Sequence, residues 1–314
     1  QGLSSAAAFT GAFLVGATTG WALALFWAMR VAPPLQGAVE WDRLGNIWST
    51  NGQLLAAALP FAITLGVLPY VIRIEKFMVA ASGGATLGAV FHVAQLAWLA
   101  GLVVPAAIRS ALLPVLGRVR DNPSEHRNEL HRATDMCFGL LPYGLFGGYI
   151  IMSVFAPLAF PSAYLDGTHG ASAVDVFVIL LAGWAFTLLA TPTYTSLMAG
   201  HHPWRFTGFI VLVLVAASLL GYGLVLEGSE EPARKLHSAA VASSLSAGVL
   251  LVLSWWMSGE FDAVQHRKIE WFAVLLGSLV VVVGLFSGTL LWVFGLPLFW
   301  FTKQGWRAIR ATSD

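Results

Sequence analysis

The stretch VDVFVILLAGWAFTLLATPTYTSLMA, residues 174–199, holds a single charged side chain, Asp175, in 26 residues. A helix of about 20 apolar residues crosses ~30 Å of hydrocarbon at ~1.5 Å per residue. Stretches of this kind recur along the chain. They predict nine transmembrane helices, at residues 4–29, 52–72, 84–108, 135–157, 174–199, 205–226, 236–258, 269–285 and 288–302. The sequence therefore predicts an all-α, polytopic helical membrane protein.

Composition supports this class and excludes others. Of the 314 residues, 57% are hydrophobic and 11% are charged, whereas a soluble domain has roughly 25% charged residues. The formal net charge of +1 predicts no attraction to nucleic acid. Cys137 is the only cysteine, so the chain forms no intrachain disulfide. Nucleotide-binding, zinc-protease and serine-hydrolase motifs are absent from the sequence, and we predict neither a cofactor, nor a metal, nor an enzymatic activity.

The distribution of basic residues orients the predicted helices. Nine helices place twelve basic residues in cytoplasmic loops and four in outer loops, which agrees with the positive-inside rule and predicts a cytoplasmic C-terminus. The outer four are Arg73, Lys76, Arg234 and Lys235. This count leaves residue 1 outside without a signal sequence, so we expect further helices upstream in a longer protein.

Two local patterns predict helix ends and close packing. In the charged loop 117–134, Asn122-Pro123-Ser124 followed by Glu125 is typical of a capped helix start. Glycines cluster at Gly83, Gly84 and Gly88, where small residues let helices approach closely.

Few polar groups fall at membrane depth, and each has a structural alternative to a functional role. Arg73, Glu75 and Lys76 lie where the 52–72 helix is expected to leave the membrane; they either pair among themselves or contact an anionic head group. His92 either faces a hydrated cavity or makes an interhelical hydrogen bond, and Arg109 either lines a cavity or extends to the interface. No Asp or Glu lies near the middle of a predicted helix, so the sequence predicts no carboxylate proton relay.

Three segments resemble the polysaccharide-flippase branch of the multidrug/oligosaccharidyl-lipid/polysaccharide (MOP) exporter superfamily. They are LLAAALPFAITLGVLPYVIRIEKFMVAASGGATLGAVFHVAQLA (54–97), IRSALLPVLGRVRDN (108–122) and the stretch 157–206. In the first, Pro60, Glu75-Lys76, Gly88 and Phe91 look like the family's motif positions. The chain departs from the family in lacking five upstream helices and in having Glu75 where Asp is more usual.

The resemblance implies a chain of four parts. The first two are the last helix of an N-terminal lobe (1–31) and a cytoplasmic interfacial linker (32–51). They are followed by a six-helix C-terminal lobe (52–258) and by an extra transmembrane hairpin with a cytoplasmic tail (259–314). It also implies a bacterial-type inner membrane and a transporter that flips a lipid-linked oligosaccharide or polysaccharide precursor by alternating access.

On this interpretation Arg73, Lys76, His92 and Arg109 contact the phosphate or sugar of the substrate. The partners would be membrane lipids, the lipid-linked sugar and, in one version, further membrane subunits. The alternative is a non-transporting, flippase-like subunit that acts as a scaffold in a larger membrane complex. A third class, an intramembrane glycosyltransferase, is disfavoured because the predicted outer loops are short.

Overall fold

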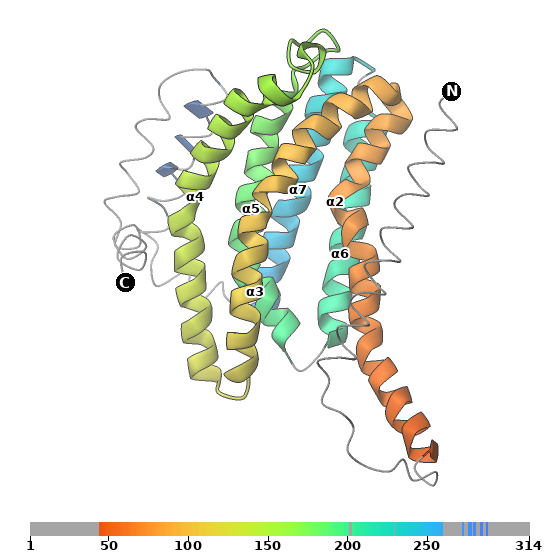
Figure 1. Cartoon of the computed structure of the whole chain (residues 1–314), viewed down its shortest axis with the longest axis vertical. Helices are drawn as coiled ribbons and strands as arrows, with labels where there is room; N and C mark the ends of the chain where they lie inside the picture. The colour runs from red at the N-terminus through yellow and green to blue at the C-terminus, as the bar shows by residue number, and fades with distance from the viewer. Residues whose placement is uncertain are drawn as a thin grey trace. The chain divides into compact units, whose positions relative to one another are not determined.

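The computed structural model describes residues 44–200, 203–228 and 230–259, together with isolated positions between 272 and 287. This part of the chain is helical and contains no strand (Figure 1). The helices are α2 (Leu44–Gly101), α3 (Val103–Arg118), α4 (Pro123–Ala159), α5 (Ala173–Ala199), α6 (Pro203–Gly221) and α7 (Pro232–Ser258), with a 3-10 turn η2 (Ser162–Tyr164) and a π-helical turn η3 (Tyr222–Leu226).

Within the described ranges, five helical segments are long and apolar enough to cross a membrane: Arg73–Arg118, Pro123–Ala159, Ala173–Ala199, Trp204–Leu226 and Pro232–Ser258. The described part of the chain is therefore all-helical, and its long apolar helices are those of a membrane-protein type. The predicted helices at 4–29, 269–285 and 288–302 fall wholly or largely outside the described residues, as does most of the predicted linker 32–51.

The chain divides into two compact units, residues 1–54 and 55–314. The second unit contains nearly all of the predicted six-helix lobe, and the account below concerns this unit.

α2 reverses direction at Gly84 and forms two antiparallel arms (Figure 1). Gly84 has φ 80° and ψ 176°, a backbone conformation that is essentially restricted to glycine. A Cβ atom added at Gly88 would lie 2.9 Å from the Cβ of Ala80, whereas eight residues of a straight helix span about 12 Å. The predicted helix 52–72 lies in the first arm, and the predicted helix 84–108 covers the second arm and the first turns of α3. The helix that contains the predicted range 52–72 does not end at residue 72, because α2 stays helical up to the Gly84 reversal.

α5 is the most buried of the candidate membrane helices, and α3, α4, α6 and α7 all contact it. The close approach of α5 to α7 depends on small residues. A Cβ atom added at Gly183 would lie only 3.1 Å from the Cα of Ser244. The Ser244 hydroxyl donates to the Ile179 carbonyl at 2.8 Å. Small side chains and interhelical hydroxyl bonds hold helices together where lipid removes the hydrophobic driving force.

α4 begins where the sequence predicted a capped helix start. Pro123 is its first residue, and the Asn122 side chain accepts a hydrogen bond from the Glu125 amide at 3.4 Å. The helix then continues without interruption to Ala159, so the charged segment after Pro123 and the predicted helix 135–157 form one element.

Candidate functional site

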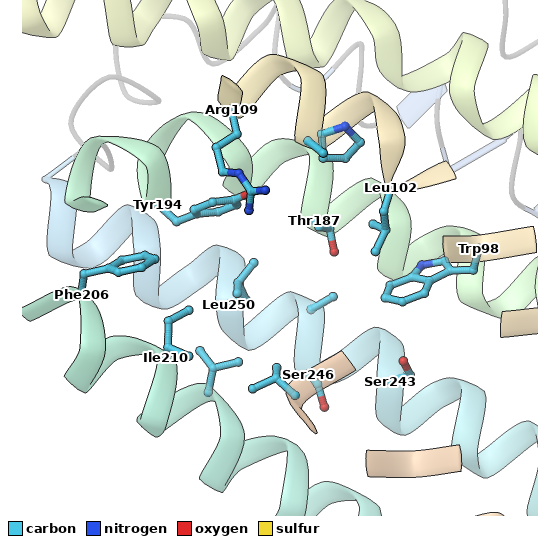
Figure 2. Close-up of a pocket in the computed structure, with 15 residues that line it drawn as sticks. Trp98, Leu102, Arg109, Thr187, Tyr194, Phe206, Ile210, Ser243, Ser246 and Leu250 are labelled. Carbon is cyan, nitrogen blue, oxygen red and sulfur yellow. The ribbon is translucent and has the colours of Figure 1, made fainter. Parts of the chain in front are cut away.

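A cavity of about 260 Å³ lies between both arms of α2, α3, α5, α6 and α7 (Figure 2). Its walls are mainly apolar, with Val71 from the first arm of α2, Ile210 and Val213 from α6 and Leu250 from α7. Polar atoms come from Trp98, Arg109, Thr187, Tyr194, Ser243 and Ser246. A largely apolar pocket with a few placed polar groups is the usual form of a binding site for an organic molecule.

Arg109 provides the only guanidinium among the residues that line this cavity. Its side chain lies beside the Tyr194 ring at one end of the cavity, and Trp98 lies at the other end (Figure 2). Arg109 also hydrogen bonds to the Tyr194 hydroxyl. This contact holds the guanidinium at the cavity wall while leaving most of its five N–H donors available to an anion.

A break between α2 and α3 shapes this wall. Pro105 has no N–H, so the Gly101 carbonyl lacks its helical donor four residues on. The indole nitrogen of Trp184 on α5 donates to that carbonyl at 2.8 Å. The helical hydrogen bonding resumes one residue later, where the Ala106 amide donates to the Leu102 carbonyl at 3.0 Å. The break therefore has a substitute donor, and beyond it α3 presents Pro105, Ala106 and Arg109 to the cavity.

Trp98 adds an unused donor to the site. It is 6% exposed and lines the cavity, and its Nε1 has no hydrogen-bond partner among the described residues. A buried N–H without a partner costs roughly 1–3 kcal/mol relative to a bonded one. A ligand with an acceptor at this end of the cavity would remove that cost.

Glu75 lies behind the cavity wall, and sequence analysis did not place it there. Its side chain is 1% exposed, and the Ser246 hydroxyl oxygen is 3.3 Å from Oε1. Oε2 has no hydrogen-bond partner in the described part of the chain. Ser246 lines the cavity, so one hydroxyl connects the buried carboxyl to the site. The predicted helix bounds placed Glu75 outside the 52–72 helix, whereas α2 continues past residue 72 and buries this carboxyl.

The structure separates the four predicted site residues into two places. Arg109 lines the cavity, as one of the two interpretations predicted. Lys76 donates to His92 Nδ1 at 3.0 Å across the two arms of α2, and Arg73 lies close enough to act electrostatically on both. None of these three lines the cavity. His92 and Arg109 are 17 positions apart, about 25 Å along a helix.

The cluster formed by Arg73, Lys76 and His92 is basic. Glu75 bonds to Ser246 rather than to its neighbours, and the ion pairs found among the described residues do not include Arg73 or Lys76. The interpretation that these charges pair among themselves is therefore wrong for this part of the chain.

No group of three or more His, Cys, Asp or Glu side chains that could hold a metal ion occurs among the described residues. Comparison with models of known protein families, with curated proteins and with solved structures finds no match for this chain.

Proposed function

We propose that the protein is a membrane transporter, and that its cavity binds one end of an amphipathic substrate that carries an anionic group. The observation that supports this most directly is Arg109 at one end of a largely apolar cavity. A guanidinium binds phosphate or carboxylate with paired hydrogen bonds. The adjacent Val, Leu and Ile side chains suit a hydrocarbon chain.

Within this class, a lipid-linked saccharide is the substrate that the resemblance to polysaccharide flippases implies. Such a molecule has a phosphate between an apolar chain and a polar sugar. In this cavity Arg109 would hold the phosphate, Trp98 at the other end would donate to a sugar oxygen, and the α6 wall would contact the lipid. A cavity of about 260 Å³ is at the lower limit for ligand pockets of roughly 300–1,000 Å³. It would hold the phosphate and its neighbouring groups and leave the rest of the molecule outside.

Helix breaks beside the cavity support movement between two access states. The Gly101–Pro105 break lies directly beside Arg109, and the Gly84 reversal joins the two arms of α2 that contribute Val71 and Trp98. In many transporters, discontinuous helices form the substrate site at the interface where one helix bundle moves against another.

Transport by the reconstituted full-length protein tests the proposal. Proteoliposomes would contain a fluorescent short-chain polyprenyl phosphate sugar, and membrane-impermeant quenching would report its movement between leaflets. We expect movement above that of empty liposomes and a decrease of roughly 10- to 100-fold in Arg109→Ala, the range for one buried charge-assisted interaction. Arg118→Ala, at the exposed end of the same helix, is the matched control. Movement no faster than in empty liposomes would overturn the proposal and favour the scaffold alternative.

A further inference from the structure

We propose that Glu75 is a proton-binding site that couples a proton to the substrate cavity through Ser246. This inference rests on the proposed transport function and names the ion that would accompany the substrate. It follows from the burial of the carboxyl, from the count of hydrogen atoms around it and from the position of Ser246.

Hydrogen-bond counting favours a protonated carboxyl. The Ser246 oxygen lies 2.7 Å from the Ala242 carbonyl and 3.3 Å from Glu75 Oε1. A serine hydroxyl has one hydrogen and two acceptor lone pairs, so it cannot donate to both oxygens at once. The shorter contact identifies Ala242 as its acceptor. A proton on Glu75 Oε1 then donates to the Ser246 oxygen, and both contacts are satisfied.

Among the described residues, no cation is paired with the Glu75 carboxyl. Glu75 is 1% exposed, and Oε2 has no partner among the described residues. A buried carboxylate without a paired charge or a full set of hydrogen bonds costs several kcal/mol, because it loses its hydration. The neutral acid avoids most of this cost.

In the described part of the neighbouring helices, the charged and titratable groups are bonded to other partners or, like His237, lie more than two helical turns from Ser246. On α2, Lys76 bonds to His92, and Arg73 belongs to the same cluster. On α7, Lys235 bonds to the Ser82 carbonyl and Glu230, and His237 lies nine residues from Ser246. Arg109 on α3 pairs with Tyr194 on α5. Between Phe206 and Gly221, α6 has no ionisable side chain.

Ser246 links this proton to the substrate. Its hydroxyl belongs to the cavity wall, so a ligand that fills the cavity excludes water from the Ser246 end and favours the neutral acid. By reciprocity, protonation of Glu75 favours ligand binding by the same factor. When the cavity opens to water, the proton leaves Oε1 for water and the carboxylate is hydrated. One linked proton changes the substrate affinity by up to about tenfold per pH unit.

Infrared spectroscopy of the full-length protein tests the protonation itself without any substrate. At neutral pH we expect a carbonyl band of a protonated carboxyl that is lost in Glu75→Gln and retained in Glu125→Gln, which alters an exposed carboxyl of α4. In Ser246→Ala the band should remain and move to the higher frequency of a carboxyl without its hydrogen bond. If the band is absent, or is unchanged in Glu75→Gln, the inference is overturned.

A second measurement tests the coupling and keeps it distinct from the proposed function. In proteoliposomes we expect the substrate movement of the wild-type protein to depend on pH, and that of Glu75→Gln to be independent of pH. If Glu75→Gln moves the substrate with the same pH dependence as the wild type, the coupling is overturned and the transport function still stands. Absence of movement in the wild type, with the Glu75 band present, would overturn the transport function and the coupling that rests on it.

Discussion

The indole nitrogen of Trp184 lies 2.8 Å from the carbonyl oxygen of Gly101, the backbone acceptor that Pro105 leaves without a helical donor. A side chain from α5 thus closes the gap in the backbone hydrogen bonding between α2 and α3. Beyond the break, α3 continues with Arg109 on the cavity wall.

Replacing this donor should destabilise the protein. Trp184→Phe retains most of the ring but leaves the Gly101 carbonyl without a partner, at a cost of about 1–3 kcal/mol. Denaturant-induced unfolding in detergent micelles would measure the change in the free energy of unfolding. Trp256→Phe, at a position 69% exposed on α7, should alter it by less than about 0.5 kcal/mol. Equal effects of the two changes would mean that the indole bond does not stabilise the break.

The reversal of α2 should depend on a glycine at residue 84. Its φ of 80° and ψ of 176° belong to a region where any other residue costs about 1–3 kcal/mol. Gly84→Ala should lower the free energy of unfolding by that amount.

Gly117→Ala is the matched control for this change. Gly117 lies in α3, and a Cβ there meets no atom within 4 Å, so alanine should raise stability by up to about 1 kcal/mol through its greater helix propensity. A neutral Gly84→Ala variant would contradict the observed backbone conformation.

Two glycines one turn apart on α4 should respond differently to alanine. A Cβ at Gly144 would overlap the ring of Trp184, whereas at Gly147 it meets nothing within 4 Å. Gly144→Ala should therefore destabilise the protein by about 1–3 kcal/mol through overpacking. Gly147→Ala should be neutral or slightly stabilising. Thermal unfolding of the two purified variants side by side makes this comparison, and a greater loss in Gly147→Ala would contradict the packing of α4 on α5.

Trp98 should contribute to binding through its free N–H. Trp98→Phe removes this donor and retains an aromatic wall, so an anionic amphiphile should bind about 3- to 10-fold more weakly, the range for one neutral hydrogen bond. Titration calorimetry with a short-chain polyprenyl phosphate sugar would measure the dissociation constant. An unchanged dissociation constant would remove Trp98 from the site.

Much of the helical structure could be predicted from local sequence. Apolar runs identify the helices because the length of a membrane helix is fixed by the bilayer, and the predicted ranges 174–199 and 236–258 lie within α5 and α7. The start of α4 at Pro123 was predicted because a cap depends on residues adjacent in sequence.

The end of the first arm of α2 could not be predicted in the same way. Arg73, Glu75 and Lys76 resemble an exit from the membrane. Their actual partners, Ser246 for Glu75 and His92 for Lys76, lie 171 and 16 residues away in the sequence. Only the tertiary packing makes a helical, partly buried position for these charges tolerable.

Of the residues that line the candidate site, sequence analysis named only Arg109, because a charged residue is rare beside an apolar helix. Tyr194, Ser246 and Ile210 come from three other helices, and no local pattern connects them. One usable signal was present: Trp98, Leu102, Pro105 and Arg109 recur at helical spacing and line one wall.

The most direct test of the central claim is the difference in affinity between a short-chain polyprenyl phosphate and the corresponding polyprenol, measured by calorimetry on the full-length protein and on Arg109→Gln. If Arg109 receives the anionic group, the wild type should bind the phosphate at least about tenfold more tightly than the alcohol, and Arg109→Gln should bind the two equally. If the wild type does not distinguish them, or if Arg109→Gln retains the full preference for the phosphate, the cavity is not the anion-binding site of this protein.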